Sequence, residues 1–348
     1  MQKGVATVAQ LSGFDEIIDA RTPAEFAEDH LPGAVNLPVL DNEQRIIVGT
    51  MYKQQSAFEA RRVGGAMVAA NIAHHLQTAL CDKPRSWRPL IYCWRGGQRS
   101  GSFTTWLRMV GWDACQLQGG YKAFRHHVIA GIEQIAPGLD LRVVCGPTGS
   151  AKTRVLEALA TLGAQTLDLE DLAAHKGSVL GALPNRPQPA QKHFETMLHA
   201  QLVTLNLARP VYIEAESRRI GMVFVPEPLI MRMRAAPCIM IDATRDARLE
   251  FLIRDYAYLG DDVAGLQRSL QRLRELQSRD TLARWHALAE AHALPALFGE
   301  LMDLHYDPLY RRSQNGNYLR YADAPSLHTD DLSPAGIHAL ARRILELG

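Results

Sequence analysis

The first feature of this sequence that could do chemistry is a cysteine that opens a loop of glycines and arginines. Cys93 follows the apolar run 89–92 and precedes a stretch with helical spacing. A loop before a helix N-terminus turns backbone N–H groups inward, so it binds anions and favours a thiolate. We predict that the Cys93 sulfur attacks a chalcogen or phosphorus centre; a buried structural cysteine is the alternative. The predicted anion loop comprises Arg95, Gly96, Gly97, Gln98, Arg99 and Ser100.

A second loop has the composition of a phosphate-binding site. It lies between the strand-like run 141–145 and a helical stretch, and it is similar to the Walker A pattern. In that pattern backbone N–H groups hold phosphates, the lysine reaches their oxygens and the hydroxyl residue binds Mg²⁺. Ala151 replaces the usual glycine before the lysine, which argues against ordinary nucleotide hydrolysis. The predicted diphosphate-binding residues are Gly146, Thr148, Gly149, Ser150, Ala151, Lys152 and Thr153.

Acidic residues could complete the phosphate site. Glu214 and Glu216 end an apolar run and share one side if that strand continues. With Asp168 they are candidates for holding Mg²⁺ or for acid–base chemistry, while a solvated strand end is the alternative. The five cysteines form no CxxC or CxxH pair, so we expect no structural metal and no tightly bound cofactor.

Composition limits the classes of protein that this chain can belong to. The 348 residues are 47% hydrophobic and 22% charged, with a net charge of +1, which predicts a soluble protein of two domains. The chain is no polycation, so a nucleic-acid site would need basic residues gathered on one face. Neither a signal pattern nor an apolar run of about 18 residues is seen, and free thiols fit a reducing compartment, so we expect the cytoplasm.

The elements that must position both loops alternate between strand-like and helix-like stretches. This alternation predicts an α/β fold in which helices cover both faces of a parallel sheet. A helix-breaking segment at 135–138 predicts a boundary between residues 1–137 and 138–348. A helical, arginine-rich region is expected at 264–293. Strands are predicted at 14–20, 89–93, 115–117, 141–145, 210–214 and 238–242, and 31–37 is predicted to be a turn that leads into a further short strand.

The first part of the chain resembles the rhodanese family. The resemblance rests on residues 18–26 and 30–38, and Cys93 lies where the rhodanese persulfide cysteine would lie. The loop from Cys93 to Arg99 is one residue longer than in common sulfurtransferase rhodaneses. This length suits a bulkier group than sulfane sulfur, such as a selenium-bearing or phosphate-bearing one.

Nearly the whole chain, to about residue 307, resembles the tRNA 2-selenouridine synthase family. The matching stretches are 47–54, 93–100, 119–125, 168–173, 175–178 and 214–221. The resemblance implies a rhodanese-like domain followed by a P-loop NTPase-like domain with a helical extension. It also implies that selenium from selenophosphate replaces sulfur at C2 of wobble 2-thiouridine in tRNA, after geranyl diphosphate has geranylated that sulfur. The Walker-like loop would hold geranyl diphosphate, and the cysteine loop would handle selenophosphate delivered by a supplier.

A tRNA substrate requires basic residues along the path of the anticodon. Each candidate could instead belong to a solvated helix face. Two other functions stay open: a P-loop ATPase or kinase with a rhodanese regulatory or sulfur-relay module, and a cysteine-dependent phosphatase. The phosphatase lacks an evident acid near the loop, and bulky Trp94 follows its cysteine. The sequence leaves the oligomeric state open. The candidate tRNA contacts are Arg61, Arg125, Arg218, Arg219, Arg268 and Arg272.

Overall fold

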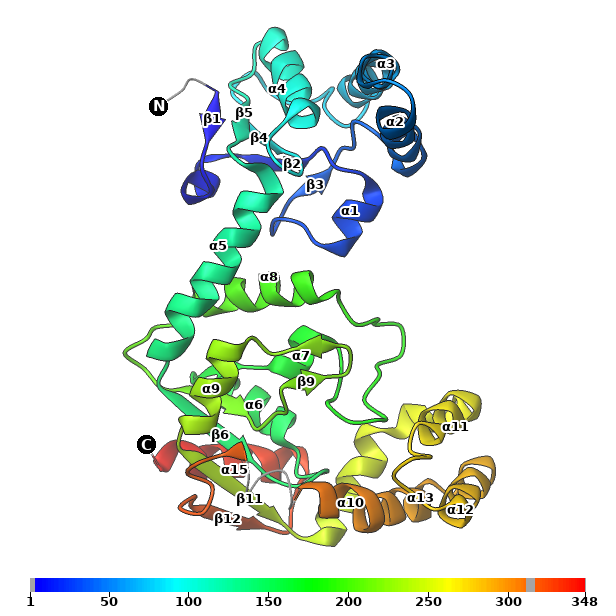
Figure 1. The fold of residues 1–348 in the computed structure, drawn as a ribbon. Helices are drawn as coiled ribbons and strands as arrows, with labels where there is room; N and C mark the ends of the chain where they lie inside the picture. Colours follow the sequence, from blue (N-terminus) through cyan, green and yellow to red (C-terminus); the bar gives the residue numbers. More distant parts are fainter. Residues whose placement is uncertain (1–3, 311–316, 348) are drawn as a thin grey trace. The chain divides into compact units, whose positions relative to one another are not determined.

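The computed structural model describes residues 4–310 and 317–347 (Figure 1). By its internal contacts the chain divides into two units. Unit 1 runs to residue 131 and includes 195–200, and unit 2 contains 132–194 and the chain from 201 onward. The boundary predicted from the sequence falls at the 3-10 turn Ala136–Gly138, directly before the first strand of unit 2.

Unit 1 is built on a five-stranded parallel sheet in the order β1-β5-β4-β2-β3. Its central strand β4 is buried at every position, which explains why it reads as a continuous apolar run. The cysteine loop starts where β4 ends. The strands are β1 (Val5–Ala6), β2 (Glu16–Asp19), β3 (Val35–Asn36), β4 (Pro89–Tyr92) and β5 (Cys115–Leu117).

The helices of unit 1 begin where the sequence supplies caps. Thr22 Oγ1 accepts from the Glu25 N–H at 3.3 Å, and the Glu25 carboxylate accepts from the Thr22 N–H at 3.1 Å, so the predicted capping box is confirmed. Ile91 and Phe103 pack in the core between the sheet and its helices. The helices are α1 (Pro23–Glu28), α2 (Asn42–Gln54), α3 (Ala57–Gln77), α4 (Gln98–Val110) and α5 (Gly120–Ile135), with the 3-10 helix η1 (Val8–Gly13).

Unit 2 contains a second five-stranded parallel sheet, in the order β12-β11-β6-β8-β7. The three central strands were predicted from their apolar runs, whereas β7 and β12 were not. A two-stranded antiparallel hairpin follows β8. The strands are β6 (Leu141–Cys145), β7 (Gln165–Leu167), β8 (Val211–Glu214), β9 (Arg219–Ile220), β10 (Val223–Phe224), β11 (Cys238–Ala243) and β12 (Ser326–Thr329).

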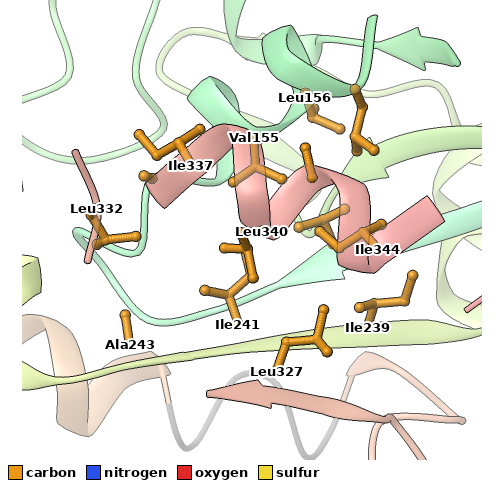
Figure 2. Packing of buried hydrophobic residues seen from close by; sticks show 14 of the residues in the cluster. Val155, Leu156, Ile239, Ile241, Ala243, Leu327, Leu332, Ile337, Leu340 and Ile344 are labelled. Atoms are coloured by element: carbon orange, nitrogen blue, oxygen red, sulfur yellow. The ribbon is translucent and has the colours of Figure 1, made fainter. Parts of the chain in front are cut away.

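Helices α6 and α15 cover one face of this sheet. Figure 2 shows Leu340 of α15 lying between the α6 residue Val155 and the sheet residue Ile241, and Ile344 of α15 lying next to the sheet residue Ile239. Burying each such side chain stabilises the fold by about 1.5–3 kcal/mol. This packing fixes β6 and α6, which flank the phosphate loop. The helices around the sheet are α6 (Lys152–Thr161), α7 (Leu169–Ala173), α8 (Gln191–Leu202), α9 (Glu227–Ala235), α10 (Arg245–Asp255) and α15 (Pro334–Glu346).

The predicted arginine-rich helical region is confirmed and has a core of its own. Trp285, which is fully buried, packs with Leu270 and Leu297. Within the described ranges no helix is both long and apolar enough to cross a membrane. The elements of this region are η3 (Ala257–Gly260), α11 (Val263–Gln271), α12 (Arg279–Glu290), α13 (Leu294–Leu301) and the π-helix η4 (Met302–Tyr306).

Candidate functional site

The thiol of Cys93 lies at the N-terminus of α4 in unit 1. The residue is 3% exposed and follows directly after β4. Its sulfur accepts a hydrogen bond from the Gly97 N–H at 3.3 Å and one from Ser100 Oγ at 3.0 Å. Both donors lie in the predicted anion loop.

The start of α5 supports this loop from behind. The N–H groups of Tyr121 and Lys122 donate to the carbonyls of Cys93 (2.8 Å) and Trp94 (3.0 Å). Gly120 has a φ of 58° in the left-handed region, and a Cβ there would lie 2.2 Å from the Cys93 oxygen. Only glycine therefore permits this contact.

The two arginines of the loop differ in their surroundings. Arg95 is exposed, whereas Arg99 Nη1 lies 2.6 Å from Glu25 Oε2. Burial alone would raise the pKa of Glu25, but the hydrogen bond and the charge of Arg99 outweigh it and lower that pKa. The charge of Arg99 is thus offset by a carboxylate of α1.

The phosphate loop connects β6 to α6 in unit 2. Lys152 Nζ donates to the Gly146 carbonyl at 3.0 Å, which holds the ammonium over the loop. Ala151 is buried and has a φ of 58°, a left-handed conformation that glycine adopts more readily. The alanine therefore keeps a backbone conformation that glycine favours.

Arg248 of α10 fixes the loop from outside and was not identified from the sequence. It is 6% exposed and donates to the Thr148 carbonyl at 3.0 Å. Its second guanidinium nitrogen lies 2.7 Å from Asp307 Oδ2. The position of the loop thus depends on a residue about one hundred positions further along the chain.

Three carboxylates meet beside the phosphate loop. One oxygen each from Glu170, Glu214 and Glu216 lies within 4.8 Å of the others. Thr153 Oγ1 is 3.1 Å from Glu170 Oε2 and 3.1 Å from Glu214 Oε2. Within the described residues Glu214 Oε1 has no hydrogen-bond partner, although the side chain is 1% exposed. An orphan buried oxygen in such a group suits a bound cation.

The protonation of this group follows from burial and crowding. Burial first, and then the charge of Glu170, raises the pKa of Glu214 well above its usual value. Burial and the charge of Glu216 do the same for Glu170. Burial and the charge of Glu214 raise the pKa of Glu216 to about 8. The three groups can therefore either share protons or hold a divalent cation.

Asp168 lines the same cavity but is not a member of this close group of three carboxylates. Its Oδ1 accepts from the Asp171 N–H at 2.8 Å, so it caps α7. Glu170, two positions later, joins Glu214 and Glu216 instead. Glu170 belongs to the acidic stretch 168–171, which the sequence does show. The sequence does not show which acidic residue of that stretch contacts Thr153.

A cavity of about 840 Å³ joins these groups in unit 2. The phosphate loop and the three carboxylates line one part of it, and Phe251, Leu252 and Tyr256 line another. A smaller apolar recess of about 20 Å³ shares Thr148, Leu252 and Tyr256 with it and is also lined by Phe298 and Met302. The predicted phosphate loop and these apolar side chains therefore line one cavity.

Comparison with known sequences now places the chain. Residues 5–127 match the Rhodanese-like domain, and 139–264 match the tRNA 2-selenouridine synthase AAA domain. The tRNA 2-selenouridine synthases of Cronobacter sakazakii and Salmonella newport are 33% and 35% identical to this chain. These alignments cover 85% of the chain and 86% and 88% of the relatives. The chain belongs to the tRNA 2-selenouridine synthase family.

This membership confirms the resemblance found in the sequence. The tRNA 2-selenouridine synthase of Nitrosomonas europaea is 39% identical over 69% of this chain. The alignment covers 63% of that protein, so the chain spans less than two thirds of its length. Within this family member, the rhodanese-like match contains the cysteine loop and the AAA match contains the phosphate loop.

The six arginines considered for tRNA binding lie in different surroundings in this synthase-family chain. In unit 1, Arg61 is exposed on α3, and Arg125 is paired with Glu195. In unit 2, exposed Arg218 lies 3.1 Å from Glu227, and Arg268 lies 3.6 Å from Asp262. The remaining two, Arg219 on β9 and Arg272 after α11, are exposed.

Proposed function

We propose that this chain is a tRNA-modifying enzyme that replaces sulfur by selenium at C2 of wobble 2-thiouridine. Selenophosphate supplies the selenium, and geranyl diphosphate first converts the sulfur into a leaving group. The observation that carries the proposal is that one chain of this family combines a thiol loop with a phosphate loop, and that the phosphate loop borders a cavity lined in part by apolar side chains. The choice of 2-selenouridine in tRNA as the product follows the names of the relatives.

The prenyl step suits the cavity of unit 2. Backbone N–H groups of the phosphate loop and Lys152 would hold the diphosphate, and the apolar lining at Phe251, Leu252 and Tyr256 would receive the geranyl chain. The thiouridine sulfur attacks C1 of the geranyl group. A carbon–sulfur bond forms, and diphosphate leaves with the electron pair of the carbon–oxygen bond.

We propose that Mg²⁺ binds the hydroxyl of Thr153 and the carboxylates of Glu170, Glu214 and Glu216. Oxygen donors are the ligands that this ion prefers, and the orphan oxygen of Glu214 fits a cation. When bound, the ion supplies positive charge that stabilises a departing diphosphate. Lys152 holds the other diphosphate oxygens and orients the leaving group.

The selenium step would use the cysteine loop. Selenium in selenophosphate is already at the selenide level, so a sulfur–selenium bond would need an oxidant. Attack of the Cys93 thiolate on phosphorus balances without one, because a sulfur–phosphorus bond forms and selenide leaves with the electron pair of the phosphorus–selenium bond. Selenide then adds to C2 of the geranylated base, the geranyl thiolate leaves, and water hydrolyses the phosphocysteine.

A tRNA substrate needs surfaces for phosphates and unstacked bases. The hairpin of β9 and β10, which begins three residues after Glu216, exposes Phe224 with the Arg219 guanidinium 5.8 Å from its ring centre. An exposed aromatic ring beside an arginine suits base stacking. We propose that this hairpin contacts the anticodon loop. We also propose that the enzyme works in the cytoplasm, where a selenophosphate supplier can deliver its labile product.

The test is an incubation of the full chain with thiolated tRNA, geranyl diphosphate, selenophosphate and Mg²⁺, followed by mass spectrometry of the nucleosides. We expect geranylated thiouridine without selenophosphate, and 2-selenouridine when it is added. A folded chain that forms neither product would contradict the proposal. Nucleotide hydrolysis abolished by Lys152→Ala would instead support the alternative P-loop ATPase or kinase.

A further inference from the structure

A buried hydroxyl next to the sulfur of Cys93 has a choice of acceptors. Ser100, on the first turn of α4, is fully buried, and its Oγ lies 3.0 Å from Cys93 Sγ and 3.4 Å from the Gly97 carbonyl oxygen. A hydroxyl carries a single proton. Whichever acceptor receives that proton determines whether the sulfur has two donors, Gly97 N–H and Ser100 O–H, or the Gly97 N–H alone.

The Gly97 carbonyl already has two donors. The Gly101 N–H lies 2.9 Å from this oxygen, and Gln116 Nε2 lies 3.0 Å from it. A carbonyl oxygen has two lone pairs, so both are occupied. The Cys93 sulfur, which is also the nearer of the two acceptors, is therefore the one still able to accept the Ser100 proton.

Gln116 also acts on the hydroxyl directly. Its Nε2 lies 2.8 Å from Ser100 Oγ, so the amide donates one proton to Gly97 and the other to Ser100. The opposite amide orientation would place the oxygen of Gln116 against the Gly97 oxygen, two acceptors without a proton between them. The amide orientation is thus fixed by the Gly97 carbonyl, and it leaves Ser100 as a donor.

We infer that Gln116 is a positioning residue that directs the Ser100 proton onto the sulfur of Cys93. Gln116 lies on β5, outside the cysteine loop, and is half-buried. With its amide in place, the thiolate accepts hydrogen bonds from both Gly97 and Ser100. The inference rests on the proposed function only in taking Cys93 as the reacting thiol.

The test measures alkylation of Cys93 by iodoacetamide across a range of pH values. Mass spectrometry of the Cys93-containing peptide separates this thiol from exposed Cys81. In Gln116→Ala the Gly97 oxygen becomes open to the Ser100 proton. We expect alkylation at neutral pH to slow by about five-fold, the effect of one hydrogen bond, and its pH profile to move to higher pH. Gln118→Ala, an exposed glutamine just beyond β5, is the matched control.

A double-mutant cycle separates positioning from a general structural effect. Ser100→Ala alone should also slow alkylation, and adding Gln116→Ala to it should change the rate no further. An equal Gln116 effect with and without Ser100, or no effect at all, would overturn the inference. Gln116→Met, which fills similar space without a donor, repeats the test if the alanine variant folds poorly. The assay needs no tRNA, so an inactive synthase would leave its outcome meaningful.

Discussion

Arg99 Nη1 lies 2.6 Å from Glu25 Oε2, so an arginine of the cysteine loop is held by a carboxylate that also caps α1. Two roles, linking neighbouring helices and contacting the thiol, therefore belong to different groups of the loop. Arg99 links α4 to α1, whereas the Gly97 N–H donates to the Cys93 sulfur. A sequence pattern of cysteine, five residues and arginine therefore does not by itself place the arginine on the bound anion.

Glu25→Gln should strengthen anion binding at the loop. Glutamine keeps an acceptor for the Thr22 N–H but removes the charge that offsets Arg99. We expect phosphate to protect Cys93 from iodoacetamide at concentrations about five-fold lower than in the wild type. Glu28→Gln, exposed on the same helix, is the control and should leave protection unchanged. Unchanged protection in Glu25→Gln would mean that Arg99 does not reach the anion.

Lys152→Ala should block geranylation. The variant removes the ammonium that lies over the phosphate loop, and losing one such charge at a leaving group costs about 100-fold or more in rate. Geranyl-thiouridine formed from thiolated tRNA and geranyl diphosphate is the measurement. Lys53→Ala, exposed on α2, should behave like the wild type. Normal product from Lys152→Ala would move the diphosphate site elsewhere.

Cys93→Ala should stop selenium incorporation while geranylation continues. The two reactions are assigned to different units, so loss of the thiol leaves the cavity of unit 2 intact. Nucleoside analysis should show geranyl-thiouridine accumulating without 2-selenouridine. Selenouridine persisting in this variant would remove Cys93 from the chemistry, and a trapped phosphocysteine in the wild type would support attack on phosphorus.

Local patterns made most of the fold predictable. Strands β4, β6, β8 and β11 lie inside their sheets and are almost entirely apolar, and the capping box of α1 is visible in four consecutive residues. The edge strand β12, Ser326–Thr329, has one buried residue in four and carries no such signal. The strand β7 has only three residues.

The missed site residues depend on contacts between distant parts of the chain. Glu170 of α7 meets Thr153 of α6 only once the chain has folded, and Arg248 reaches Thr148 across about one hundred positions. Gln116 meets Ser100 because β5 lies beside β4 in the sheet. The spacing of residues along the sequence predicts none of these contacts. The two loops could be predicted because all their residues are consecutive.

Gly120→Ala should destabilise unit 1 strongly. A Cβ at this position would lie 2.2 Å from the Cys93 carbonyl oxygen, and the φ of 58° is itself strained for alanine. Backbone must shift to relieve the contact, so we expect a loss of more than about 2 kcal/mol in the free energy of unfolding. Chemical denaturation measures it. Gly138→Ala, with no atom within 4 Å of the added Cβ, is the matched control.

The carboxylates of unit 2 should make stability depend on pH and on Mg²⁺. The pKa of Glu216 is raised to about 8 by burial and by Glu214. An acid with a raised pKa in the folded state is held neutral there. Its contribution to stability is therefore full below its ordinary value of about 4.3 and is lost as the pH rises through the folded value. In EDTA we expect the Tm to fall progressively from about pH 4.3 to about pH 8 and to level off above it.

Mg²⁺ should reverse this fall, because a bound divalent cation compensates the charges that repel one another at high pH. The rise in Tm on adding Mg²⁺ should be larger at high than at low pH. Glu216→Gln should flatten the pH dependence and reduce the Mg²⁺ effect, while Glu346→Gln, at the exposed end of α15, should change neither. A Mg²⁺ effect equal at both pH values, or unchanged in Glu216→Gln, would show that the ion does not bind these three carboxylates.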